Sequence, residues 1–278
     1  MVYLQKKSLD LKSYTLVFNK VKDKVLDMID SFDSLANNFV NLDQSNIENC
    51  QLDENPNAMD FEIKGNEIEA ENLSFAYDSK TILENFSMRI PSGQKLAITG
   101  VNGSGKSTFT KLLLGLYNYE GSLRIDGLEY STISKKRVRE AIAYVPQVSF
   151  LFDSTIIENL KCGSESVADE KVVEFSKMYN MHDTFKELGY DRRVGERGKF
   201  LSGGQRQKIC FLRAVIRNSQ ILVLDEATSN MDEASELEII ESIKTHMQSK
   251  TVIMIVHNLK LLGHFDKILF LGIKTNMR

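Results

Sequence analysis

The stretch that decides the fold is Gly100-Val101-Asn102-Gly103-Ser104-Gly105-Lys106-Ser107. It matches the pattern G-x-x-x-x-G-K-[ST], the P-loop, at every fixed position, and an apolar run over residues 95–99 precedes it. Glycines let backbone N–H groups approach phosphates closely, and a helix starting near Lys106 presents the positive end of its dipole to the same anion. Lys106 is expected to reach the β- and γ-phosphates, and Ser107 to ligate Mg²⁺. The pattern therefore predicts a nucleoside triphosphate site.

Three further apolar runs end, like residues 95–99, at a residue able to do chemistry. They are residues 141–146 followed by Gln147, residues 221–224 followed by Asp225 and Glu226, and residues 251–256 followed by His257. Continuous β-branched and Leu-rich runs are typical of parallel strands buried on both faces. In open sheets of this kind, ligands bind beyond the carboxyl ends of the strands. We therefore predict an α/β fold, a P-loop NTPase core whose mixed or parallel sheet is flanked by helices.

The residues at these strand ends are candidates for metal binding and proton transfer around one nucleotide. Asp225 is expected to hold Mg²⁺ through water, and Glu226 to accept a proton from the attacking water. Gln147 could touch Mg²⁺ or that water, while His257 could contact the γ-phosphate and orient Glu226. Each has a plainer alternative. The acids after residues 221–224 could simply cap the next helix. Gln147 could be an ordinary loop residue, and His257 a structural histidine. The neighbouring P-loop favours the catalytic interpretation.

A second glycine-rich stretch, Leu201-Ser202-Gly203-Gly204-Gln205, lies about a hundred residues beyond the P-loop. It falls near the end of a segment, about residues 134–214, that is expected to form a mostly helical subdomain inserted in the sheet. A serine hydroxyl and glycine amides donate hydrogen bonds without steric bulk, so this stretch could bind the far side of a γ-phosphate. The intervening helices make it hard for the stretch to reach the P-loop of its own chain.

Residues 1–65 differ from the rest of the chain. Over residues 11–42, apolar side chains recur at steps of three and four, which predicts an amphipathic helix, and a polar linker follows it. The main domain is predicted over residues 66–278. The formal net charge of -3 and the pI near 5.9 argue against a nucleic-acid partner. No run of about 18 apolar residues occurs, so we expect a cytoplasmic chain that meets a membrane only through a partner.

The motifs together resemble, in their order along the chain, an ATP-binding cassette (ABC) nucleotide-binding domain over roughly residues 66–278. The resemblance implies ATP and Mg²⁺ as cofactors. It also implies a second nucleotide-binding domain. The P-loop of that domain would face residues 201–205 of this chain, the LSGGQ stretch, across a bound ATP. Tyr77 is implied to stack on adenine, although a strand tyrosine packed in a small sheet is the plainer alternative.

The resemblance completes the set of expected site residues. Those expected to bind the nucleotide are Tyr77, Gly100, Asn102, Gly103, Ser104, Gly105, Lys106, Ser107, Thr108, Ser202, Gly203, Gly204, Gln205 and Asp232. Those expected to act in catalysis are Glu226, His257, Lys106 and Gln147, and those expected at the metal are Ser107, Gln147 and Asp225.

Three segments look like the exporter branch of this family. Residues 194–198, Val-Gly-Glu-Arg-Gly, look like the segment of exporter-type domains that faces the coupling helices of the transmembrane domain. Residues 158–160, Glu-Asn-Leu, are likewise exporter-like. The helix over residues 11–42 resembles the lead-in from a transmembrane domain. The resemblance thus implies an ATPase that powers export through a transmembrane partner at the inner face of the cell membrane. Two alternatives stay open: a non-transport ABC ATPase, and a truncated, inactive fragment of an exporter.

Overall fold

The computed structural model describes residue 63 and residues 65–272 of the chain, all of which belong to one compact unit. The helix expected over residues 11–42 lies outside the described residues, and so does nearly all of the expected linker. In the described part of the chain, no helix is both long enough and apolar enough to cross a membrane.

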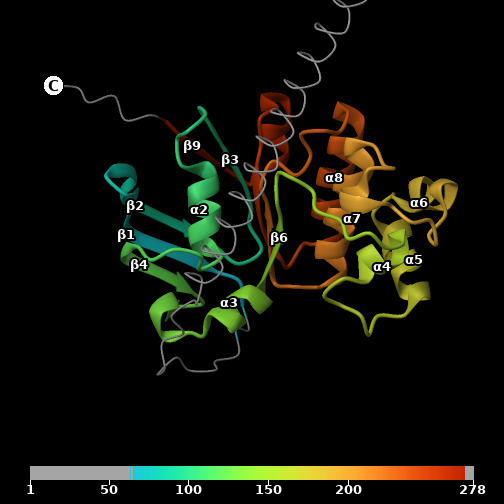
Figure 1. Ribbon diagram of the computed structural model, residues 1–278. Helices are drawn as coiled ribbons and strands as arrows, with labels where there is room; N and C mark the ends of the chain where they lie inside the picture. The colour runs from blue at the N-terminus through green and yellow to red at the C-terminus, as the bar shows by residue number, and fades with distance from the viewer. Residues whose placement is uncertain (1–62, 64, 273–278) are drawn as a thin grey trace, which may run out of the picture. The chain divides into compact units, whose positions relative to one another are not determined.

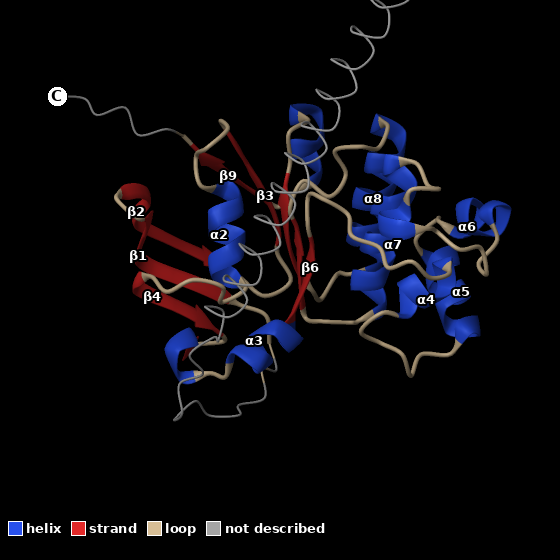
Figure 2. Ribbon diagram, in the orientation of Figure 1, coloured by secondary structure: helices blue, strands red, loops and turns tan. Residues whose placement is uncertain are grey.

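A five-stranded sheet forms the centre of this unit (Figures 1 and 2). Its strands, in spatial order, are β6 (Ile142–Val145), β7 (Ile221–Leu224), β8 (Thr251–Ile255), β3 (Lys95–Gly100) and β9 (Lys267–Leu271). Every pair of neighbours in it is parallel. The predicted parallel strands are therefore confirmed, and their carboxyl ends meet at one edge.

Both faces of this sheet are buried, which explains the continuous apolar runs. In β7, Ile221 and Val223 belong to one hydrophobic cluster, while Leu222 and Leu224 belong to the other. Because successive side chains of a strand point to opposite faces, each run has to be apolar throughout to fill both clusters.

A second, antiparallel sheet lies on one side of the central sheet. Its strands, in order, are β2 (Lys80–Ile90), β1 (Ile68–Tyr77), β4 (Glu120–Ile125) and β5 (Leu128–Glu129). Helix α2 (Lys106–Leu113) lies between the two sheets: its buried Phe109 and Leu112 share a cluster with residues of β1 and of β3. The helix that follows the P-loop is therefore packed against both sheets.

Helices cover the opposite face of the central sheet (Figure 1). Those between β6 and β7 are α4 (Ile156–Lys161), α5 (Asp169–Met178), α6 (His182–Leu188) and α7 (Gly203–Ile216), and α8 (Glu233–His246) follows β7. The short helices are α3 (Lys135–Ala141), η1 (Tyr130–Thr132), η2 (Glu196–Gly198) and η3 (Leu259–His264). The range expected for the helical subdomain, about residues 134–214, begins too early, because it includes β6, which pairs with β7 in the central sheet.

Candidate functional site

The P-loop joins the end of β3 to the start of α2. Gly105 is the N-cap of α2 and has a φ of 98°, a left-handed conformation that glycine adopts without steric cost. The buried Lys106 ammonium donates to the carbonyl oxygens of Gly100 at 2.9 Å and Val101 at 3.0 Å, so it lies within the loop. The first turn of α2 carries no acidic residue. These features make the loop suitable for binding an anion.

The other residues of the loop divide between its exposed tip and the start of α2. Asn102 and Gly103 are exposed, Ser107 is half-buried, and Ser104 and Thr108 are buried. Within the described residues, the buried Ser104 hydroxyl has no hydrogen-bond partner. A buried donor left unpaired is costly, so its presence in this loop fits a phosphate oxygen as the missing partner.

Asp225 meets the P-loop helix across the edge of the sheet. It follows β7 directly and is only 3% exposed. Among the described side chains its hydrogen-bond partners are hydroxyl groups: Ser107 at 3.0 Å, Tyr144 at 3.0 Å and Thr110 at 3.4 Å. Burying a carboxylate among neutral groups is costly, so this one suits a cation. Mg²⁺ prefers oxygen ligands, which Asp225 and Ser107 provide.

Glu226 is held between Gln147 and His257. The Nε2 atom of His257 lies 2.6 Å from Oε1 of Glu226, and the Gln147 side-chain amide donates to Oε2. The backbone of Glu226 has a φ of 51°, which is uncommon for a residue with a side chain and occurs often at functional sites. Its side chain is 16% exposed, so water can reach it. The ends of β6, β7 and β8 thus bring these three side chains together.

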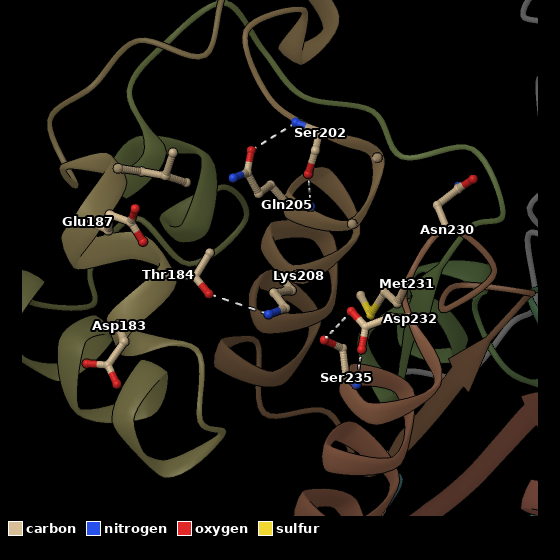
Figure 3. Close-up of a pocket in the computed structure, with 13 residues that line it drawn as sticks. Asp183, Thr184, Glu187, Ser202, Gln205, Lys208, Asn230, Met231, Asp232 and Ser235 are labelled. Carbon is tan, nitrogen blue, oxygen red and sulfur yellow. Dashed lines mark hydrogen bonds between the residues drawn. The ribbon is translucent and has the colours of Figure 1, made fainter.

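The LSGGQ stretch forms the start of α7 (Figure 3). Ser202 is the N-cap: its hydroxyl accepts from the backbone N–H of Gln205 at 3.2 Å, and its own N–H donates to Oε1 of Gln205 at 2.8 Å. This reciprocal pair is a capping box. Gly203 and Gly204 follow, so the first turn of the helix has little side-chain bulk, and it carries no acidic residue. The positive end of the helix dipole is therefore accessible.

A cavity of about 530 Å³ lies beside this end of α7, between α6 and the loop before α8 (Figure 3). Lys208 lines it and donates to the Thr184 hydroxyl at 3.4 Å. Asp232 also lines it and caps α8, accepting from the Ser235 backbone N–H and hydroxyl, both at 2.9 Å. These hydrogen bonds hold the pKa of Asp232 below its usual value. The P-loop residues 100–107 are all described, and none of them lines this cavity. The structure does not bring the two motifs of one chain into one cavity.

Tyr77 is the last residue of β1 and packs against other aromatic rings. Its ring centroid lies 4.8 Å from that of Phe75 and 5.4 Å from that of Tyr117, both edge to face. Such contacts are favourable between aromatic side chains. They would also be expected of a strand tyrosine without a ligand, so the stacking of Tyr77 on adenine stays a prediction.

Two residues of this site, Tyr144 and Thr110, were not predicted from the sequence. Both hydroxyls contact Asp225. Burial and the neighbouring carboxylate raise the pKa of the Tyr144 hydroxyl, so it remains a donor. Tyr144 is the one residue with a polar group on its side chain within the apolar run of residues 141–146, and that was the signal available in the sequence.

Comparison with known proteins gives a consistent set of relatives. A family model described as ABC transporter matches residues 83–229. An ATP-dependent lipid A-core flippase of Syntrophus aciditrophicus (strain SB) is 37% identical over 207 residues, which cover 73% of this chain and 34% of the flippase. ATP-binding cassette sub-family B member 6 of Xenopus tropicalis is 36% identical over 229 residues, covering 81% of this chain and 27% of the relative.

A solved structure of a bacterial Atm1-family ABC exporter with ATP bound is also similar, with a TM-score of 0.74 and 34% identity. The match covers 78% of this chain and 39% of the exporter chain. This chain therefore spans between 27% and 39% of the length of these relatives. The family model covers more than half of the chain and contains both glycine-rich motifs. The chain belongs to the ABC transporter family, and its described residues form an ABC ATP-binding domain.

Proposed function

We propose that this chain binds ATP with Mg²⁺ and hydrolyses it to power export across a membrane. The observation that carries the proposal is the position of Glu226, which contacts both Gln147 and His257 beside the P-loop and Asp225. A carboxylate held by two neutral or cationic donors at the edge where phosphates would bind is suited to accept a proton from water.

The residues present fit a magnesium ion. Asp225 and Ser107 would hold it, Asp225 through water, and Gln147 lies near enough to Glu226 to reach the same region. Among the described residues, no group of three or more histidine, cysteine or acidic side chains could hold a metal alone, which fits an ion that takes its other ligands from nucleotide phosphates and water. When bound, Mg²⁺ would neutralise charge on the transferred phosphoryl group.

The chain itself would position the water and the phosphates. Lys106 and the P-loop amides would bind the β- and γ-phosphates, while Glu226 would take the proton of the attacking water. His257, as a donor from Nε2, would fix one oxygen of Glu226, and the amide of Gln147 would fix the other. Tyr77 would stack on adenine.

The second half of each ATP site would come from another nucleotide-binding domain. Ser202, Gly203 and Gly204 present a helix N-terminus beside an open cavity that the P-loop of this chain does not line. A γ-phosphate bound to the P-loop of a second domain would fit there, with Asp232 at the rim. ATP would then hold two domains together, and hydrolysis would release them.

Transport is the part of the proposal that depends on the relatives. A flippase and an exporter are among the proteins that this chain resembles. We therefore propose a transmembrane partner and a place at the inner face of the cell membrane. A non-transport ABC ATPase would lack such a partner, and co-purification of a membrane protein with this chain distinguishes the two.

ATP hydrolysis by the purified chain tests the enzymatic part of the proposal. We expect Mg²⁺-dependent phosphate release that falls by at least about a hundredfold in the Glu226→Gln variant, because the amide cannot accept the proton. Glu233→Gln, which removes a carboxylate from the exposed start of α8, is the matched control and is expected to keep the wild-type rate. An inactive wild-type chain would favour the truncated-fragment alternative.

A further inference from the structure

Asp225 makes two hydrogen bonds with strand β6, one through its backbone and one through its carboxylate. Its backbone N–H donates to the carbonyl of Val145 at 2.9 Å, and its Oδ2 atom accepts from the Tyr144 hydroxyl at 3.0 Å. Val145 is the neighbour of Tyr144, and β6 pairs directly with β7, which leads into Asp225. Strand β6 thus contacts both the backbone and the side chain of this aspartate.

The two oxygens of Asp225 have different surroundings. Oδ1 accepts from the hydroxyl of Ser107, the residue at the predicted metal position. Oδ2 accepts from Tyr144 at 3.0 Å and, at a longer 3.4 Å, from Thr110, whose hydroxyl also donates to the backbone oxygen of Ser107 at 2.9 Å. Tyr144 therefore makes the shorter contact to the oxygen that faces away from Ser107.

We infer that Tyr144 is a positioning residue for the metal site: by holding Oδ2 of Asp225, it keeps Oδ1 directed toward Ser107 and the magnesium ion. The inference rests on the proposed function, since it concerns how that site holds its metal. Hydrogen bonds to a charged acceptor are the stronger ones in proteins, and groups that orient a metal-binding carboxylate commonly change metal affinity when removed.

The side chain of Tyr144 is well placed for this role. It is half-buried and packs against the hydrophobic cluster that contains α2 and the inner residues of β7. Its ring is therefore fixed by packing, and its hydroxyl donates to Oδ2 of Asp225 and also interacts with the Thr110 hydroxyl. Phenylalanine would keep this packing and remove only the hydroxyl, so Tyr144→Phe tests the contacts of that hydroxyl, and Thr110→Val tests the part that involves Thr110.

The test measures binding of a fluorescent, non-hydrolysable ATP analogue to the chain, first in EDTA and then during titration with Mg²⁺. For Tyr144→Phe we expect an unchanged dissociation constant in EDTA. We also expect half-maximal tightening at about tenfold more Mg²⁺ than the wild type requires, the change typical of a lost outer-shell partner. Thr110→Val is expected to shift the Mg²⁺ requirement less, because its contact with Asp225 is longer.

Tyr130→Phe is the matched control, because the Tyr130 hydroxyl is buried without a hydrogen-bond partner among the described residues. It is expected to behave as wild type. A wild-type Mg²⁺ requirement for Tyr144→Phe, or a lower one, would overturn the inference and leave the proposed function intact. Weaker binding of Tyr144→Phe in EDTA as well would also overturn it, since the role would then be structural. Absence of Mg²⁺-dependent binding in the wild-type chain would overturn the proposed function itself.

Discussion

Replacement of Lys106 by methionine tests how the P-loop binds phosphate. Methionine keeps an unbranched apolar stem of similar length and removes the ammonium. In the structure this ammonium is buried and donates to two loop carbonyls, those of Gly100 and Val101. An ammonium has three N–H donors, so one remains for a phosphate oxygen without disturbing the loop.

The expected loss follows from that single donor. A hydrogen bond involving a charged group contributes about 1.5–3 kcal/mol, which corresponds to about 10- to 150-fold in affinity. Lys106→Met should therefore weaken ATP binding at least tenfold. If binding draws one of the other two donors away from a carbonyl, the loss will lie toward the upper end of that range.

Isothermal titration calorimetry with ATP and Mg²⁺ measures this loss directly. Lys111→Met is the matched control, because Lys111 lies in the last turn of the same helix and is half-buried outside the loop. It is expected to bind ATP as the wild type does. Wild-type affinity in Lys106→Met would refute the assignment of the loop as the phosphate site, provided that both variants unfold at temperatures close to that of the wild type.

Two further predictions concern the stability of the fold. Gly100→Ala should lower the unfolding free energy by at least about 2 kcal/mol in urea denaturation, because φ is 138° and a Cβ atom would collide with the Leu271 carbonyl oxygen. Gly115→Ala should lower it less, because Gly115 also has a positive φ but open space around it. Hydrogen bonds from Ser154 and Thr155 lower the pKa of Glu158 from 4.5 to about 2, so its stabilising effect is present above pH 4.5 and lost toward pH 2. The difference in melting temperature between wild type and Glu158→Gln should therefore shrink over that range; a constant difference would contradict it.

The parallel strands could be predicted from sequence because their burial on both faces leaves an unbroken apolar run. The run of residues 221–224 matches β7 at both ends, and the run of residues 251–256 ends one residue beyond β8. Strand β1 gives no such signal, since Glu69 and Glu71 interrupt its apolar residues and its sheet is less fully buried. The antiparallel sheet was for that reason not predicted strand by strand.

The site was predictable where motifs specify residues and not where contacts depend on strand order. The sequence indicated that Gln147, Glu226 and His257 would meet, because parallel strands end at a common edge. The contact of Tyr144 with Asp225 depends on β6 lying directly beside β7, an order that no local pattern reveals. The left-handed backbone of Glu226 is likewise a tertiary feature.

In the proposed mechanism, one ATP binds between the P-loop of one domain and the LSGGQ stretch of another. The most direct test is the mass of the Glu226→Gln variant in solution, measured by light scattering with and without ATP and Mg²⁺. This variant should bind ATP without hydrolysing it. We expect a monomer without nucleotide and a dimer with ATP. We also expect Ser202→Arg, which places a long side chain in the cavity beside α7, to abolish the dimer. A Glu226→Gln chain that binds ATP and stays monomeric would show that the ATP site is not shared between two domains.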